Sequence, residues 1–174
     1  MLQFVDKFAG TPIRDLRSGR QIATLGDPIL NPNNLVIEAF YGISRVRPGR
    51  VVFTSDIREV GQLGVIVKSK DKLMETDQLV RLKELIDLDF ELKGKRVITD
   101  KKRKVGKLVD YAIDARSFRV EKLYVRPSVI RSIGKGDLVV GRKQIVEIND
   151  EEIVVKDSEI YANASRQASL TPAS

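Results

Sequence analysis

The chain repeats itself, and this internal repeat constrains the fold more than any other feature of the sequence. Residues of roughly 8–73 align with residues of roughly 91–160 at a shift of about 83, which grows to about 88 further along. Gly10 meets Gly94 one residue out of step. Aligned pairs of similar character include Asp27 with Asp110, Glu38 with Glu121, Tyr41 with Tyr124, Leu25 with Leu108, Leu35 with Phe118, Ile57 with Ile145 and Val65 with Ile153. The sequence therefore predicts that one small domain has been duplicated.

Short apolar segments separated by turn-forming residues run through both copies. They are rich in β-branched and aromatic side chains, as in Val51–Phe53, Gly64–Val67, Lys122–Val125 and Glu152–Val155. Their spacing of roughly 8 to 12 residues is typical of an all-β barrel or sandwich. We therefore expect an all-β chain.

The segment between the copies changes to a helical period. Leu79, Leu82, Leu85 and Ile86 recur at helical spacing, and Gly and Pro are absent from 75 to 91. After Tyr161 the chain has too few apolar side chains to offset the entropy of ordering, which predicts a disordered tail. The expected organisation is a first repeat at 1–74, a linker helix at 75–89, a second repeat at 90–161 and a tail at 162–174.

Composition argues against catalysis. The 174 residues contain neither cysteine nor histidine, so disulfides, thiol nucleophiles and the commonest metal ligands are excluded. We expect no catalytic residues, no metal and no cofactor. No stretch approaches the roughly 20 apolar residues of a membrane span, and residues 1–7 lack a continuous apolar segment, so we expect a soluble cytoplasmic protein.

The glycine and apolar pattern resembles a known family. The second copy carries it in Leu92–Val97, Val105–Tyr111, Glu121–Val125 and Gln144–Ile148, and the first copy in Gly10–Ile13, Ala23–Asp27 and Asp56–Val60. These segments resemble the PRC-barrel, a small β-barrel found in the photosynthetic reaction-centre H subunit and in the C-terminal domain of the ribosome maturation factor RimM. The resemblance implies two tandem PRC-type β-barrels. It implies a fold rather than an activity.

Positive charge is concentrated in one segment of the second copy. Residues 93–107 contain eight cations against the single acid Asp100, an excess equal to the net charge of +7 of the whole chain. The cations are Lys93, Lys95, Arg96, Lys101, Lys102, Arg103, Lys104 and Lys107. The family pattern places Lys101–Lys104 at the tip of a hairpin. This tip is either a site for RNA or another polyanion, or a solvated turn whose charges keep strand edges from aggregating.

A second basic group lies in the irregular stretches of both copies. Its members are Arg47, Arg126, Arg131, Arg142 and Lys143. The Arg-Pro step recurs at Arg47–Pro48 and Arg126–Pro127, where proline ends a strand. The group forms either a partner-facing loop or a set of arginines whose stems pack on the barrels.

These observations favour a non-catalytic adaptor that binds a protein partner in an RNA-processing or ribosome-maturation setting. The alternative is direct binding of RNA or the ribosome through the basic hairpin. The sequence leaves open whether the chain forms a homo-oligomer. A structure separates the hypotheses, because an adaptor needs an exposed apolar surface and an RNA-binding protein needs cations gathered on one face.

Overall fold

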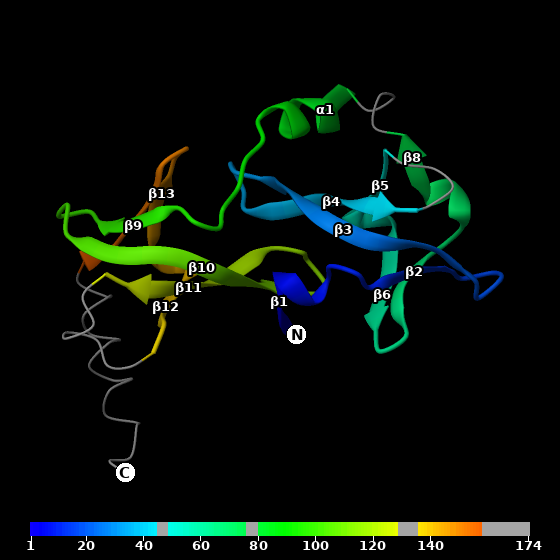
Figure 1. The fold of residues 1–174 in the computed structure, drawn as a ribbon, viewed down its shortest axis with the longest axis horizontal. Helices are drawn as coiled ribbons and strands as arrows, with labels where there is room; N and C mark the ends of the chain where they lie inside the picture. Colours follow the sequence, from blue (N-terminus) through cyan, green and yellow to red (C-terminus); the bar gives the residue numbers. More distant parts are fainter. Residues whose placement is uncertain (45–48, 76–79, 129–135, 158–174) are drawn as a thin grey trace, which may run out of the picture. The chain divides into compact units, whose positions relative to one another are not determined.

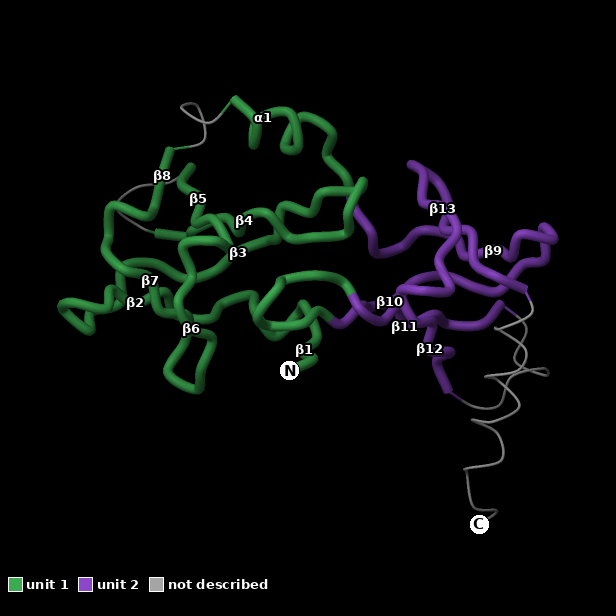
Figure 2. The backbone as a smooth tube through the Cα atoms, turned by 180° about the vertical axis from the view of Figure 1, so that it is seen from behind, with its two compact units in different colours: residues 1–90, 113–120 green, residues 91–112, 121–174 purple. Residues whose placement is uncertain are grey.

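The computed structural model describes residues 1–44, 49–75, 80–128 and 136–157. The chain divides into two compact units, shown in different colours in Figure 2. The first unit comprises residues 1–90 together with 113–120, and the second comprises residues 91–112 and 121–174. The segment 113–120 therefore belongs to the first unit, although it lies within the predicted second repeat.

The first unit is built on a sheet in the order β6-β7-β2-β3-β4-β5-β8 (Figure 1). All neighbouring strands are antiparallel except β2 and β7, which are parallel. The strands are β2 (Pro12–Asp15), β3 (Gln21–Asn31), β4 (Val36–Ile43), β5 (Arg50–Phe53), β6 (Ile57–Gly61), β7 (Gly64–Val67) and β8 (Leu73–Glu75). Short 3-10 helices occur at η1 (Val5–Lys7), η2 (Thr54–Asp56) and η3 (Lys70–Lys72).

The second sheet has the order β12-β11-β10-β9-β14-β13, and a short strand β1 (Leu2–Phe4) also pairs with β10. Its strands are β9 (Arg96–Thr99), β10 (Lys104–Asp114), β11 (Val120–Pro127), β12 (Leu138–Gly141), β13 (Ile145–Ile148) and β14 (Glu152–Val155), with a 3-10 helix η5 (Arg142–Gln144). The predicted all-β character is confirmed. The two predicted barrels are not confirmed, because the strands of the described residues form two sheets and no closed barrel.

The sequence repeat corresponds to a repeat in strand order. The path β6-β7-β2-β3-β4-β5 recurs as β13-β14-β9-β10-β11-β12, and its one parallel pair recurs as β9 with β14. The register recurs too, because Ile13 pairs with Val65 and Val97 pairs with Ile153. A parallel pair at the same place in both sheets is a specific feature that supports duplication.

The glycine that both copies share, Gly10 and Gly94, makes an equivalent backbone hydrogen bond in each copy. The Gly10 N–H donates to the Leu25 carbonyl at 2.8 Å, and the Gly94 N–H donates to the Leu108 carbonyl at 2.9 Å. Both glycines have a positive φ, 77° and 83°, in the left-handed region that strongly favours glycine. Each glycine therefore fixes the entry of the chain into the first strand of its copy.

The tips of two equivalent hairpins have the same unusual conformation. Leu35 between β3 and β4 has a φ of 58°, and Phe118 between β10 and β11 has a φ of 52°. Each residue donates its N–H to the carbonyl four residues earlier, Asn31 at 2.9 Å and Asp114 at 2.8 Å. Bulky residues rarely adopt a positive φ, so tertiary contacts hold both tips in place.

Within the first unit these two tips pair with each other. The Ile37 N–H donates to the Phe118 carbonyl and the Val120 N–H donates to the Leu35 carbonyl, both at 2.9 Å. Val36 and Arg119 lie opposite each other in this antiparallel bridge. Val36 and Arg119 are themselves equivalent positions of the two copies, so the bridge joins matching segments of the repeat.

An aromatic cluster buries the Phe118 side chain. The Phe118 ring contacts Phe8 edge-to-face with centroids 6.2 Å apart, and contacts Phe40 in the same way at 6.1 Å. Phe8 and Phe40 stack at 5.6 Å, and all three rings are buried. Such aromatic pairs stabilise a fold by roughly 0.5–1.5 kcal/mol each beyond the burial of their area.

One α-helix lies within the predicted linker segment and packs on the first unit. It is α1 (Val80–Asp87), and its Leu82 side chain is buried against Ile29, Ala39 and Val51. Burial of a leucine contributes about 1.5–3 kcal/mol, enough to hold this short helix against the sheet. Leu79, on which the helical period also depended, lies outside the described residues. So does the predicted disordered tail at 162–174.

Replacement of Phe118 by alanine should lower the free energy of unfolding by roughly 3–5 kcal/mol, because it leaves a cavity between two rings. Urea denaturation followed by circular dichroism measures the change. Phe4→Ala is the matched control, since Phe4 is 37% exposed, and it should lose less than about 1.5 kcal/mol. Equal losses in the two variants would contradict the structural role of Phe118.

Candidate partner-binding groove and basic hairpin

The basic segment forms the hairpin that the sequence predicted. β9 pairs with β10 in antiparallel fashion, and residues 100–103 make the turn between them. The Thr99 hydroxyl oxygen accepts hydrogen bonds from the N–H groups of Lys101 and Arg103, at 3.3 and 3.2 Å. Lys102 takes up a φ of 62° at the end of the turn. The turn is therefore ordered by its own hydrogen bonds.

Five of the eight predicted cations bind partners inside the second unit. Lys93 Nζ lies 3.1 Å from Asp110, and Arg96 lies 2.7 Å from Glu151. Lys101 and Arg103 lie 3.2 and 3.7 Å from the same carboxylate oxygen of Asp157. The buried Lys95 ammonium donates to the Asp150 carbonyl. These side chains have structural roles that the sequence did not reveal.

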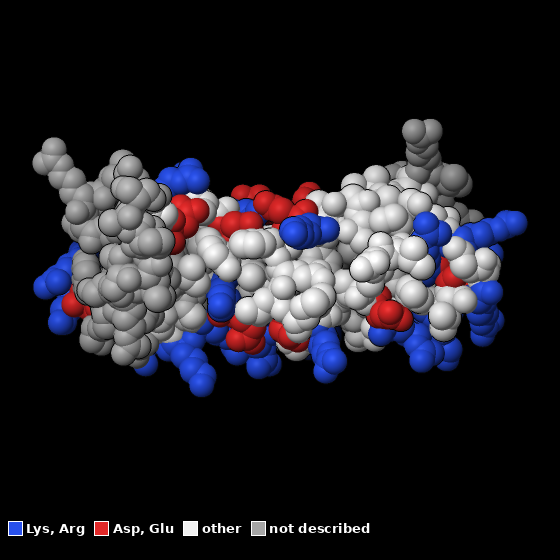
Figure 3. All heavy atoms as spheres, turned by 90° about the horizontal axis from the view of Figure 1, so that it is seen from below, with Lys and Arg blue, Asp and Glu red and all other residues white. Residues whose placement is uncertain are grey.

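The remaining three cations, Lys102, Lys104 and Lys107, are exposed and make no side-chain hydrogen bond or ion pair with the described residues. The eight cations are accompanied by five carboxylates, those of Asp100, Asp110, Glu151, Glu152 and Asp157. Within residues 93–107 the positive charges exceed the negative ones by seven. When all five of these carboxylates are counted, the excess of positive charge is three. On the face drawn in Figure 3, acidic side chains are likewise interspersed among the basic ones.

Asp157 is the acidic residue that binds the basic turn, through Lys101 and Arg103. Its burial opposes ionisation, but the Thr99 hydroxyl, Lys101 and Arg103 together lower the pKa of its carboxyl below the usual value. The Asp157 N–H also donates to Asp100 Oδ1 at 3.0 Å. The end of β14 and the tip of the basic hairpin are thereby joined by charge and by hydrogen bonds.

The second basic group is described only in part. Arg47 and Arg131 lie outside the described residues. Arg126 Nε lies 3.7 Å from Asp137 Oδ1, and Arg142 and Lys143 lie in η5. That this group faces a partner stays a prediction.

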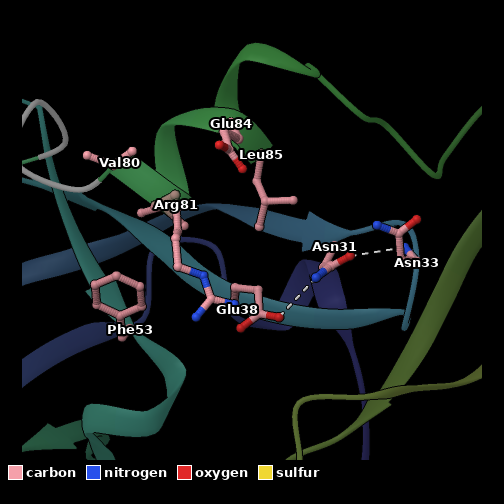
Figure 4. Close-up of a pocket in the computed structure, with 9 residues that line it drawn as sticks. Asn31, Asn33, Glu38, Phe53, Val80, Arg81, Glu84 and Leu85 are labelled. Carbon is pink, nitrogen blue, oxygen red and sulfur yellow. Dashed lines mark hydrogen bonds between the residues drawn. The ribbon is translucent and has the colours of Figure 1, made fainter.

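A groove of about 630 Å³ lies between α1 and the sheet of the first unit. It is lined by Asn31, Asn33, Glu38, Phe53, Val80, Arg81, Leu82, Glu84 and Leu85. Figure 4 shows Arg81 and Leu85 extending from the helix toward the strands, and Glu38 extending from β4. Val80 is 76% exposed at the start of the helix. The groove therefore offers apolar side chains to a ligand between charged ones.

An asparagine-rich turn orders one wall of the groove. The side-chain amides of Asn31 and Asn34 donate to Glu38 Oε1 at 3.2 and 3.4 Å. Asn31 Oδ1 accepts from the Asn33 N–H, and Asn34 Oδ1 accepts from the Val36 N–H. The Glu38 carboxylate is therefore positioned before any ligand arrives.

The second copy carries different residues at the equivalent places. The sequence alignment puts Gly141 where the first copy has Phe53, and exposed Lys122 where it has buried Ala39. Leu82 packs on Ala39. A lysine at position 39 would place a positive charge under the helix. Phe53 and Ala39 are thus not repeated in the second copy, whereas Glu38 is matched by Glu121.

The groove was not predicted from the sequence. The helical spacing of Leu82, Leu85 and Ile86 predicted a helix with an apolar stripe, and Val80 adds an apolar side chain outside that stripe. This exposed apolar residue next to charged ones was the available signal. Which strands the helix covers depends on tertiary packing, which the sequence pattern does not show.

The described residues contain no cluster of three or more acidic, histidine or cysteine side chains placed to hold a metal ion. None of the described helices has the length and apolar character needed to cross a membrane. Comparisons of the sequence with models of protein families and with curated proteins gave no match. Membership of the PRC-barrel family and a cytoplasmic location therefore stay predictions.

Replacement of Asp157 by asparagine should lower stability at pH 7, because Lys101 and Arg103 lose their counter-charge. A carboxyl with a lowered pKa stabilises the folded state above its unfolded pKa of about 3.9. That contribution disappears as the pH falls through the lower folded pKa. The difference between wild type and variant in urea unfolding should therefore shrink below about pH 4.

Asp137→Asn is the control, since Asp137 pairs with Arg126 at the surface. It should change stability by less than about 1 kcal/mol at either pH. A pH-independent loss in Asp157→Asn would show that its charge is unimportant.

Proposed function

We propose that this chain is a non-catalytic adaptor that binds a protein partner in the groove of the first unit. The observation that carries the proposal is the groove itself, in which half-buried Phe53 and Leu85 and exposed Val80 are flanked by charged residues. Apolar surface surrounded by polar groups is typical of sites that bind other molecules. Polar groups at the rim would orient the partner.

The proposed setting is RNA processing or ribosome maturation, and it rests on the resemblance to the RimM domain. We also propose that each copy is a PRC-type barrel, which the repeated strand order supports. The two copies then have different tasks. The first copy holds the partner, while the second presents the basic hairpin.

Replacement of Val80 by aspartate should abolish capture of the partner by the immobilised chain from an extract of the native cell. The new charge stands in the groove, yet an acidic residue suits the first turn of a helix, so folding should be unaffected. Leu63→Asp is the matched control, because Leu63 is 75% exposed in a turn far from the groove residues in sequence. Capture should persist in that variant. Loss in both variants, or in neither, would contradict the proposal.

A second candidate function is direct RNA binding, favoured by the exposure of Lys102, Lys104 and Lys107 on one ordered hairpin. Replacing all three by serine should weaken binding and make the slope of log K against log salt concentration less steep by about 2. Each phosphate contact contributes roughly 0.7 to this slope for single-stranded nucleic acid. Filter binding of a single-stranded RNA between about 50 and 200 mM salt measures the slope.

Lys101 and Arg103 are left in place in this test, because their loss would leave Asp157 without a counter-charge. Replacing the exposed Lys7, Lys68 and Lys83 by serine is the control for net charge. An equal change of slope in both triple variants would show that overall charge, rather than the hairpin, attracts RNA.

A further inference from the structure

The groove of the first unit is locally acidic in a basic protein. Two carboxylates, Glu38 and Glu84, and one cation, Arg81, line the groove, whereas the whole chain has a net charge of +7. The Asn amides hold Glu38 through Oε1 only, and Oε2 accepts no hydrogen bond from the described residues. This second oxygen is thus available to a donor on a ligand.

The apolar residues of the groove come from a strand and from the helix, and in Figure 4 Phe53 and Val80 lie to one side of Glu38 while Leu85 lies above it. Phe53 follows from β5, while Leu85 and Val80 come from α1, as Figure 4 shows. Phe53 and Leu85 are half-buried, so they form a firm surface for apolar side chains. A volume of about 630 Å³ lies within the roughly 300–1,000 Å³ typical of ligand sites.

From this charge and shape we propose that the groove binds an extended peptide segment of the partner protein in which a lysine or arginine lies between apolar side chains. The cation pairs with Glu38, and the apolar side chains on either side contact Phe53 and Leu85. This proposal rests on the adaptor function proposed above and adds the chemistry of the partner. The amides of Asn31 and Asn34 already hold the Glu38 side chain in place. Glu38 therefore loses less conformational entropy when it pairs with the cation of the peptide.

The test uses the full chain labelled with ¹⁵N and the capped peptide Ala-Leu-Arg-Leu-Ala. Its comparison peptide has glutamate in place of arginine. Titration followed by NMR should shift the side-chain amide signals of Asn31 and Asn34, which report directly on Glu38. The glutamate peptide should cause no such shift.

Glu38→Gln removes the charge but keeps an acceptor for both asparagines, and should weaken binding of the arginine peptide at least tenfold. Glu121→Gln is the matched control from the second copy and should leave binding unchanged. Equal binding in wild type and Glu38→Gln, equal binding of the two peptides, or no shift with either would overturn the proposal.

The outcome is distinguishable from failure of the adaptor function. If the arginine peptide fails to bind while partner capture still depends on Val80, the peptide chemistry is wrong and the adaptor function stands. If capture is also insensitive to Val80→Asp, both proposals fail.

Discussion

Phe118 lies in the core of the first unit, at the tip of the hairpin between β10 and β11, and most of both strands belongs to the second unit. Its ring contacts Phe8 and Phe40, while its backbone keeps a φ of 52° that is unfavourable for a bulky side chain. This unfavourable backbone conformation costs of order 1–3 kcal/mol, which is offset by aromatic burial and by the backbone hydrogen bonds of Phe118 to Ile37 and of Val120 to Leu35. This contact makes segment 113–120 part of the first unit.

The two copies differ at residues that form the groove. A small residue, Ala39, lets α1 lie close to the first sheet, and Phe53 adds an aromatic wall beneath the helix. Lys122 and Gly141 stand at the equivalent positions of the second copy. The shared residues therefore maintain the fold, and residues that differ between the copies line the groove.

The features that depend on local sequence patterns were predicted from the sequence. The repeat anticipated the common strand order, and the alignment of Leu35 with Phe118 matched two tips with the same rare conformation. It placed the basic turn correctly between β9 and β10. It did not predict the pairing of Lys101 and Arg103 with Asp157, because that carboxylate lies more than fifty residues away in the chain. Nor did it predict that 113–120 joins the first unit, since that depends on tertiary packing.

Hydrogen exchange at the amides of Ile37 and Val120 tests the central claim most directly. These two N–H groups make the bridge between the equivalent tips. If Phe118 anchors the tip, both amides should exchange as slowly as that of Leu25 in the middle of β3, through opening as costly as global unfolding. Exchange of Ile37 and Val120 at the rate of exposed loops, with Leu25 still protected, would contradict the account.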